Sequence, residues 1–198
     1  TQGPPVHLRD EPAMSVLAEP RDILPLAGKR VALGVTGSIA AYKACDISNR
    51  LVAAGIEVEV VMTKEASAFI APLTLQTLSR NKVMADMFAP ADEWNPQHVA
   101  AAERADLVLI APACANIIGK LASGVTDDML TCLVYATKAP VLIAPAMNAN
   151  MYRHEIVQEN IARLKKIGYR FIGPVKGHLA CGCDDVGHIA AVDDIVAE

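Results

Sequence analysis

Short apolar runs alternate with helix-patterned stretches along most of this chain, and no other feature constrains its fold as strongly. The runs are rich in Val, Ile and Leu, as β-strands are. They are expected as strands at residues 30–35, 57–62, 107–111, 141–144 and 169–172. The intervening stretches are expected as helices at residues 40–54, 66–78, 98–104, 117–121, 129–135 and 156–167. Such alternation predicts right-handed βαβ crossovers, and therefore an α/β fold with a doubly wound parallel sheet covered on both faces.

The length and composition are typical of one globular domain. The 198 residues are 53% hydrophobic, enough to bury a substantial core. The formal charge of -4 and the lack of a basic cluster disfavour a nucleic-acid partner. The longest apolar runs are too short for a membrane span, and no signal peptide is recognisable. Five cysteines at irregular spacings indicate a reducing, cytoplasmic environment.

The chain divides into a tail and a domain. Residues 1–27 contain several prolines and charges without a sustained period, which predicts an N-terminal tail or arm outside the fold. Residues 28–198 are expected to form the single folded domain. An irregular segment at residues 84–96, which contains Trp94, is a candidate interface element because Trp and Met are enriched at such surfaces.

A polar cluster follows the strand expected at residues 139–144. The sequence there is Pro-Ala-Met-Asn-Ala-Asn-Met-Tyr, residues 145–152, and Asn148 lies where open α/β sheets bind ligands. An Asn can donate an N–H to a substrate carboxylate while staying neutral, which suits decarboxylation. The alternative is that Asn148 only caps a helix beginning near Tyr152.

The first strand ends in a small-residue turn that opens a helix. Backbone N–H groups after Gly37, together with the Ser38 hydroxyl, could hold a phosphate there. Gly34 and Gly37 are three residues apart and Ala40 follows, so the G-x-G-x-x-G dinucleotide pattern is incomplete and a mononucleotide is favoured over NAD. The alternative is a tight turn with Ser38 as helix N-cap.

Two further strand ends are expected at the same edge. Thr63 offers a hydroxyl, Phe69 lies on the following helix, and the small residues around Ala113 and Cys114, up to Asn116, would let a flat ring approach the backbone. Together these ends make a flavin mononucleotide site plausible. Thr63 could instead cap the next helix, and Phe69 could be a core residue.

From about Lys29 to Glu198 the chain resembles the homo-oligomeric flavin-containing cysteine decarboxylases, and within them the branch acting on phosphopantothenoylcysteine. The resemblance rests on the joint order of motifs at residues 37–43, 111–120, 124–131, 145–152 and 179–182, with His98 preceding Ala105-Asp106-Leu107. It implies a flavodoxin-like, Rossmann-like sheet, FMN as cofactor, a trimer-based assembly, and an active site near a subunit interface.

The resemblance also implies residue roles. His98 matches a histidine required for oxidative decarboxylation, Asn148 matches the Asn that binds the substrate carboxylate, and Cys181 matches a proton donor on a flexible flap around residues 175–190. Met147 and Ala180 would contact substrate. The cofactor residues would be Gly37, Ser38, Ile39, Thr63, Phe69, Ala113, Cys114, Asn116 and Met147. The implied reaction converts 4'-phosphopantothenoylcysteine to 4'-phosphopantetheine, through oxidation of the thiol, loss of CO₂ and return of the electrons.

Other functions stay open. A related enzyme would decarboxylate the C-terminal cysteine of a peptide, and Cys181 argues against it because those enzymes lack the flap cysteine. A non-catalytic regulatory subunit would carry an acidic tail, which is absent after Glu198. A flavin prenyltransferase is disfavoured by the motif around Asn148. In the flap, His178, Cys181, Cys183 and His188 could bind Zn²⁺, although Cys-x-Cys is not the usual spacing and a metal would sequester the proton donor.

Overall fold

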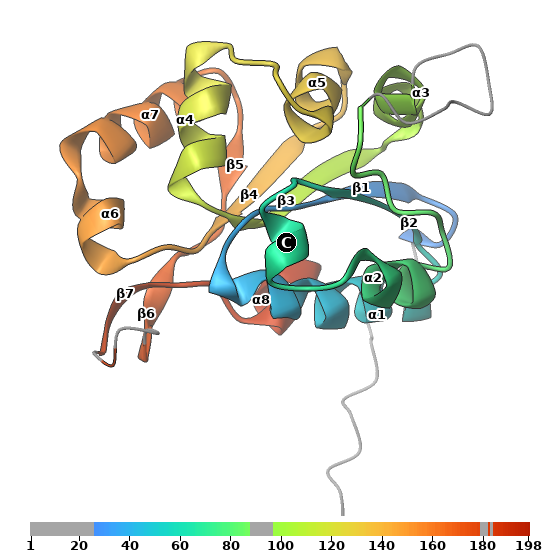
Figure 1. Cartoon of the computed structure of the whole chain (residues 1–198), viewed down its shortest axis with the longest axis horizontal. Helices are drawn as coiled ribbons and strands as arrows, with labels where there is room; N and C mark the ends of the chain where they lie inside the picture. The colour runs from blue at the N-terminus through green and yellow to red at the C-terminus, as the bar shows by residue number, and fades with distance from the viewer. Residues whose placement is uncertain (1–25, 88–96, 179–181, 183) are drawn as a thin grey trace, which may run out of the picture.

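The computed structural model describes residues 26–87, 97–178, 182 and 184–198. Its centre is a parallel sheet of five strands in the order β2-β1-β3-β4-β5, the flavodoxin-like order (Figure 1). The strands are β1 (Arg30–Val35), β2 (Glu57–Met62), β3 (Leu107–Ala113), β4 (Val141–Pro145) and β5 (Arg170–Phe171). β1 is flanked by β2 on one side and β3 on the other, so the direction in which successive strands are added to the sheet reverses at β1. This reversal creates a topological switch point between β1 and β3.

Helices cover both faces of the sheet (Figure 1). One face carries α1 (Lys43–Ala53), α2 (Pro72–Ser79) and α8 (Val192–Ala197), with α1 between the other two. The other carries α3 (Gln97–Arg104), α4 (Ala115–Ser123), α5 (Met129–Ala136) and α7 (Glu155–Lys166). The shorter elements are the 3-10 turns η2 (Ile39–Tyr42) and η3 (Ala66–Ala68), and the helix α6 (Ala149–Arg153). The predicted α/β, doubly wound parallel architecture is confirmed.

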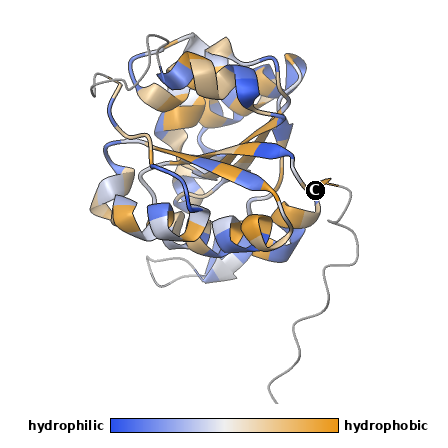
Figure 2. Ribbon diagram, turned by 90° about the vertical axis from the view of Figure 1, so that its right-hand side faces the viewer, coloured by the Kyte–Doolittle hydropathy of each residue, from blue (hydrophilic) through white to orange (hydrophobic). Residues whose placement is uncertain are grey.

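The core consists of two apolar clusters separated by the sheet. Leu33 and Leu109 point to the α1 side, while Val108 and Ile110 point to the α4 and α5 side. This division follows from the period of two in a strand, which sends successive side chains to opposite faces. The central strands β3 and β4 contain no polar residue, because both of their faces are covered. Figure 2 shows hydrophobic segments along the sheet between the two layers of helices.

Several element boundaries differ from the prediction. The helices expected at 40–54 and 66–78 each begin as a separate 3-10 turn, and α2 starts only at Pro72, whose ring suits the first helical position. Strand β3 continues past Pro112 to Ala113. The helix expected to begin near Tyr152 begins at Ala149.

The segment after β5 contains elements that the sequence analysis missed. Strands β6 (Val175–His178) and β7 (Asp184–His188) pair as an antiparallel hairpin, and α8 follows. The hairpin lacks apolar alternation, and α8 has only six residues, so neither gave a periodic signal. No helix in the described part of the chain is long and apolar enough to cross a membrane.

Some predicted features lie outside the described residues. They are most of the proposed tail at residues 1–27, Trp94 in the candidate interface segment, and Ala180, Cys181 and Cys183 in the expected flap.

Candidate active site at the carboxyl edge of the sheet

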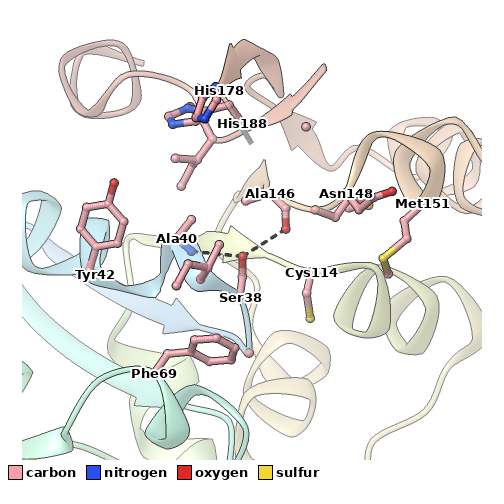
Figure 3. Close-up of a pocket in the computed structure, with 15 residues that line it drawn as sticks. Ser38, Ala40, Tyr42, Phe69, Cys114, Ala146, Asn148, Met151, His178 and His188 are labelled. Carbon is pink, nitrogen blue, oxygen red and sulfur yellow. Dashed lines mark hydrogen bonds between the residues drawn. The ribbon is translucent and has the colours of Figure 1, made fainter. Parts of the chain in front are cut away.

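A cavity of about 490 Å³ lies at the carboxyl ends of β1, β3 and β4, beside the switch point. This volume is in the range of cofactor and substrate sites. The loops after the three strands and Phe69 form most of its surface, and the β6–β7 hairpin forms another wall (Figure 3). The lining residues are Gly37, Ser38, Ile39, Ala40, Tyr42, Phe69, Cys114, Ala146, Met147, Asn148, Met151, His178, Gly187, His188 and Ile189.

The Ser38 side chain links two of these loops. Its hydroxyl accepts from the Ala40 N–H and donates to the Ala146 carbonyl, both at 3.3 Å. The first contact makes Ser38 the N-cap of η2, so the capping role considered from the sequence is confirmed. The second ties the end of β1 to the end of β4. Ser38 therefore shapes the cavity floor through protein contacts, and its role toward a phosphate stays a prediction.

A buried threonine joins the ends of β1 and β3. The Thr36 hydroxyl is fully buried, donates to the Pro112 carbonyl at 2.7 Å, and accepts from the Cys114 N–H at 3.0 Å. Both backbone groups belong to the β3 end that places Cys114 in the cavity wall. The sequence analysis missed Thr36, although a polar residue between an apolar strand and Gly37 was a usable signal.

The predicted cofactor residues occupy two adjoining cavities. A second cavity of about 80 Å³ shares Gly37 and Cys114 with the first. Thr63 and Asn116 line this smaller cavity, together with Thr36, Glu65, Ile117 and Asp128. Ala113 is fully buried in β3 and lines neither cavity. The Thr63 hydroxyl also accepts from the Ala66 N–H at 3.3 Å, at the start of η3, although the N-cap residue of that turn is Glu65.

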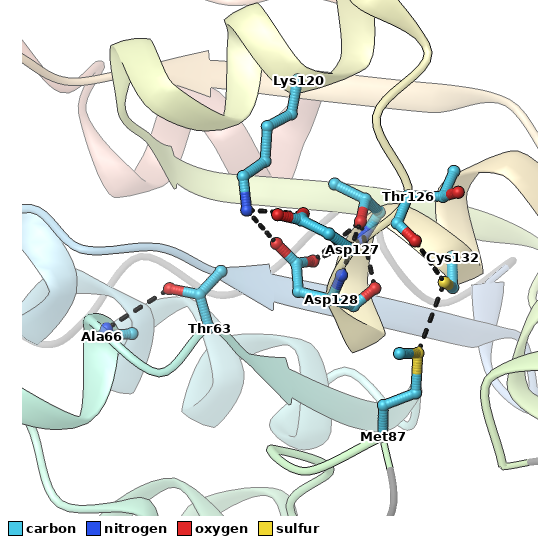
Figure 4. A network of polar contacts seen from close by, with 9 residues as sticks. Thr63, Ala66, Met87, Lys120, Thr126, Asp127, Asp128 and Cys132 are labelled. Atoms are coloured by element: carbon cyan, nitrogen blue, oxygen red, sulfur yellow. Dashed lines mark hydrogen bonds and ion pairs between the residues drawn. The ribbon is translucent and has the colours of Figure 1, made fainter.

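A charged network borders the smaller cavity (Figure 4). The Lys120 ammonium lies 2.7 Å from Asp127 and 2.8 Å from Asp128. Burial opposes the charged ammonium, but the hydrogen bonds to the two carboxylates outweigh it and raise the pKa of Lys120. Asp128 also caps α5 by accepting from the Thr131 N–H at 2.8 Å, so it fixes that helix end beside the cavity.

Asn148 lies on the cavity wall at the start of α6. Its Oδ1 accepts from the Asn150 N–H at 2.9 Å, so Asn148 caps α6, as the alternative reading predicted, although the helix begins earlier than expected. The capping hydrogen bond fixes the orientation of the side-chain amide through its oxygen. The amide nitrogen is the group that could donate to a carboxylate. Capping and carboxylate binding are therefore compatible roles.

Two imidazoles on the hairpin also line the cavity. His188 has its Nδ1 2.8 Å from the Ile189 carbonyl, and a carbonyl only accepts, so this nitrogen carries the hydrogen. His178 has its Nδ1 3.1 Å from Asp184. The sequence analysis considered both only as zinc ligands, and among the described residues no three potential ligands gather around a common point. The two cysteines of that hypothesis lie outside the described residues.

The structure does not bring every predicted site residue together. Ile39, Phe69, Cys114 and Met147 line the larger cavity as expected. His98 is the second residue of α3 and is not part of the lining of either cavity. Tyr42, Met151 and Ile189 line the cavity without having been predicted, because on the sequence they read as ordinary helix or core residues.

Comparison with known proteins identifies the family. The model of the Flavoprotein family matches residues 24–198. The chain belongs to this family. It is 48% identical over 171 residues to the "Coenzyme A biosynthesis bifunctional protein CoaBC" of Bacillus subtilis, covering 86% of this chain and 42% of that protein. It is 46% identical to a "Probable phosphopantothenoylcysteine decarboxylase" of Streptococcus mutans, covering 85% of this chain and 95% of that one. The chain thus spans about two fifths of the bifunctional relatives.

Similar solved structures support the same family. A Cys-to-Ser mutant of PPC decarboxylase complexed with pantothenoylaminoethenethiol superposes with a TM-score of 0.77 at 30% identity, covering 85% of this chain and 94% of that one. The FMN-dependent cysteine decarboxylase SpaF gives 0.77 at 31% identity, covering 87% and 95%. The predicted resemblance and the flavodoxin-like fold are therefore confirmed.

Proposed function

We propose that this domain is an FMN-dependent decarboxylase that converts 4'-phosphopantothenoylcysteine to 4'-phosphopantetheine in coenzyme A biosynthesis. The observation that carries the proposal is the position of Asn148. In a chain of the Flavoprotein family, it places a neutral amide in the same cavity as the Ser38 loop. The names of the CoaBC and phosphopantothenoylcysteine decarboxylase relatives support the substrate.

The residues present fit a flavin. Ile39, Phe69, Cys114 and Met147 give the cavity apolar surfaces for a ring. Gly37 is needed at the turn for packing, because an added Cβ would lie 2.6 Å from the Cβ of Glu65. FMN, when bound, supplies the electron transfer that oxidises and later reduces the substrate carbon–sulfur unit.

The chain's own residues would bind and orient the substrate. Asn148 would donate an N–H to the substrate carboxylate, and Met147 would pack beside it. The apolar walls would exclude water from the leaving CO₂. Cys181 would return a proton in the final reduction. His98 would serve the oxidative half-reaction, which requires a second copy to bring it to the cavity, since it does not line the cavity of its own chain.

We therefore also propose a trimer-based assembly with shared sites, working in the cytoplasm. SpaF is named an FMN-dependent cysteine decarboxylase, so the peptide ending in cysteine that was considered from the sequence is the appropriate competing substrate.

The test is the product formed under anaerobic conditions from phosphopantothenoylcysteine, compared with a cysteine-terminated peptide. Purified protein should be yellow, and the phosphorylated substrate should yield CO₂ and phosphopantetheine. A protein that takes up no FMN, or that decarboxylates only the peptide, would contradict the proposal. Replacing Ser38 with Glu should expel the cofactor, because its side chain would enter the floor of the cavity.

Variants separate the two half-reactions. Asn148→Asp should abolish CO₂ release by setting one carboxylate against another, and His98→Asn should do the same. Cys181→Ser should still release CO₂ but accumulate the enethiol, because a hydroxyl is a far weaker acid than a thiol. Cys183→Ser is the matched control. If it blocks the reduction while Cys181→Ser does not, the proton donor is two residues further along the chain.

A further inference from the structure

The helix that begins at the Asn148 cap also holds the hairpin wall of the cavity. Helix α6 has five residues, with Asn148 as its N-cap and Arg153 as its last residue. The Arg153 guanidinium makes a two-pronged ion pair with Asp185 on β7, through Nη1 to Oδ2 at 2.8 Å and Nη2 to Oδ1. The side chain of Asp185 is only 27% exposed. The pair therefore joins the element that begins at Asn148 to the strand that ends at His188.

Asp185 is held on both sides. Its Oδ1 also accepts from the Val186 N–H at 2.7 Å. The hydrogen bonds from Arg153 and Val186 keep the pKa of Asp185 below its ordinary value, so the carboxylate stays charged near neutral pH. A planar guanidinium matches a carboxylate in one orientation, which a lysine ammonium cannot reproduce.

A second contact lies two residues further along β7. The Met147 N–H donates to the Gly187 carbonyl at 3.0 Å. Gly187 has a φ of +136°, and an added Cβ there would lie 2.1 Å from the Met147 carbonyl. The hairpin is thus attached at both ends of the 147–153 segment, by backbone at Met147 and by the ion pair at Arg153. A helix of five residues has little stability of its own, so these contacts decide its position.

We infer that Arg153 and Asp185 are positioning residues for the proposed reaction. Their ion pair holds the β6–β7 hairpin against the Asn148 segment, and it thereby fixes the distance between these two sides of the substrate cavity. This inference rests on the proposed function. Neither residue lines the cavity, so they act through the elements that they join. Loosening the wall lets the oxidised, decarboxylated intermediate escape before it is reduced.

The experiment compares Arg153→Met, Asp185→Asn, the double variant and Arg153→Lys, all loaded with FMN. Each single variant should raise the ratio of released enethiol to phosphopantetheine about fivefold, which is the upper end of the effect expected from losing one partly exposed ion pair. The double variant should match the single ones, because each removes the same interaction. Arg153→Lys should recover only part of the wild-type ratio. Arg50→Met is the matched control, since Arg50 pairs with Asp193 between α1 and α8, away from the cavity lining.

Amide hydrogen exchange gives a readout that needs no turnover. Exchange in β6 and β7 should accelerate in both single variants, with no further increase in the double variant, and should be unchanged in Arg50→Met. Additive effects, or an altered product ratio with unchanged hairpin exchange, would overturn the inference. If wild-type protein releases no CO₂ from the substrate, the proposed function fails, while the exchange result still decides whether the pair fixes the hairpin.

Discussion

At the scale of single residues, Gly187 lets the backbone of the hairpin approach the backbone at Met147. Gly187→Ala should lower the free energy of unfolding by about 3 kcal/mol, because it combines a strained φ with a clash against the Met147 carbonyl. Activity should fall with it. The measurement is urea unfolding followed by turnover of the folded fraction.

Gly168→Ala is the matched control for Gly187→Ala. Gly168 has a φ of +101°, but an added Cβ meets no atom within 4 Å. It should cost only about 1 kcal/mol, from the backbone conformation alone. Equal losses at the two positions would show that the contact with Met147 contributes nothing.

Thr36 allows a test of the buried link between the ends of β1 and β3. Thr36→Val keeps the shape but leaves the Pro112 carbonyl and the Cys114 N–H without their partner, at a cost of about 2 kcal/mol. FMN affinity should drop as well, because Cys114 lines the cavity. The measurements are the unfolding midpoint and flavin fluorescence on titration.

Thr137→Val is the comparison for Thr36→Val. The Thr137 hydroxyl also donates to a carbonyl, that of Ala102, and accepts from a backbone N–H, that of Ala139. It does not line either cavity. This variant should lose stability but keep its flavin affinity. Loss of flavin in both variants would mean that general destabilisation, and not the link at the site, explains the effect.

At the scale of elements, the start of α5 should make stability depend on pH. Burial opposes the charge of Asp128, but the hydrogen bonds from Lys120 and Thr131 prevail and lower its pKa. A carboxyl with a lower pKa in the folded state stabilises the fold above its unfolded pKa of about 3.9, and this contribution disappears as the pH falls through the folded value. Wild-type protein should therefore lose stability below about pH 4 more steeply than Asp128→Asn. Urea midpoints between pH 7 and pH 3 test this, and parallel profiles would refute it.

The elements also differ in how far the sequence could predict them. The four longer parallel strands were predictable because apolar, partly β-branched runs that are buried in the sheet leave a strong signal. The two-residue β5 lies within the apolar stretch expected at residues 169–172. The hairpin was not, because Gly177, Gly187 and the charged residues around them pair through backbone and tertiary contacts and have no apolar period. The same limit applies at the site. Asn148 and Ser38 follow apolar strands and could be found, whereas Arg153 and Asp185 are ordinary surface residues until the fold brings them together.

At the scale of the whole molecule, the position of His98 predicts sites shared between chains. If a neighbouring copy supplies His98, mixing His98→Asn and Asn148→Asp proteins should restore activity that neither has alone. In randomly mixed trimers, about a quarter of the sites would combine an intact Asn148 with an intact His98 from the next chain. The measurement is CO₂ release after the two proteins are unfolded together and refolded, or coexpressed.

The control for subunit mixing uses His98→Asn with the double variant His98→Asn/Asn148→Asp, which cannot form an intact site. No recovery in either mixture would mean that each chain completes its own site. A monomer at micromolar concentration with full activity, seen by light scattering, would exclude the shared arrangement as well.

The cavity touches both apolar clusters of the core. Ala40 and Ile189 belong with the cluster on the α1 side, and Cys114 and Met147 with the cluster on the opposite side. A ligand bound there would contact both clusters, which pack on opposite faces of the sheet. Binding would therefore stabilise the folded state and make the two clusters unfold together. Calorimetry should accordingly record one sharp transition for the loaded protein and a broader one for the empty protein.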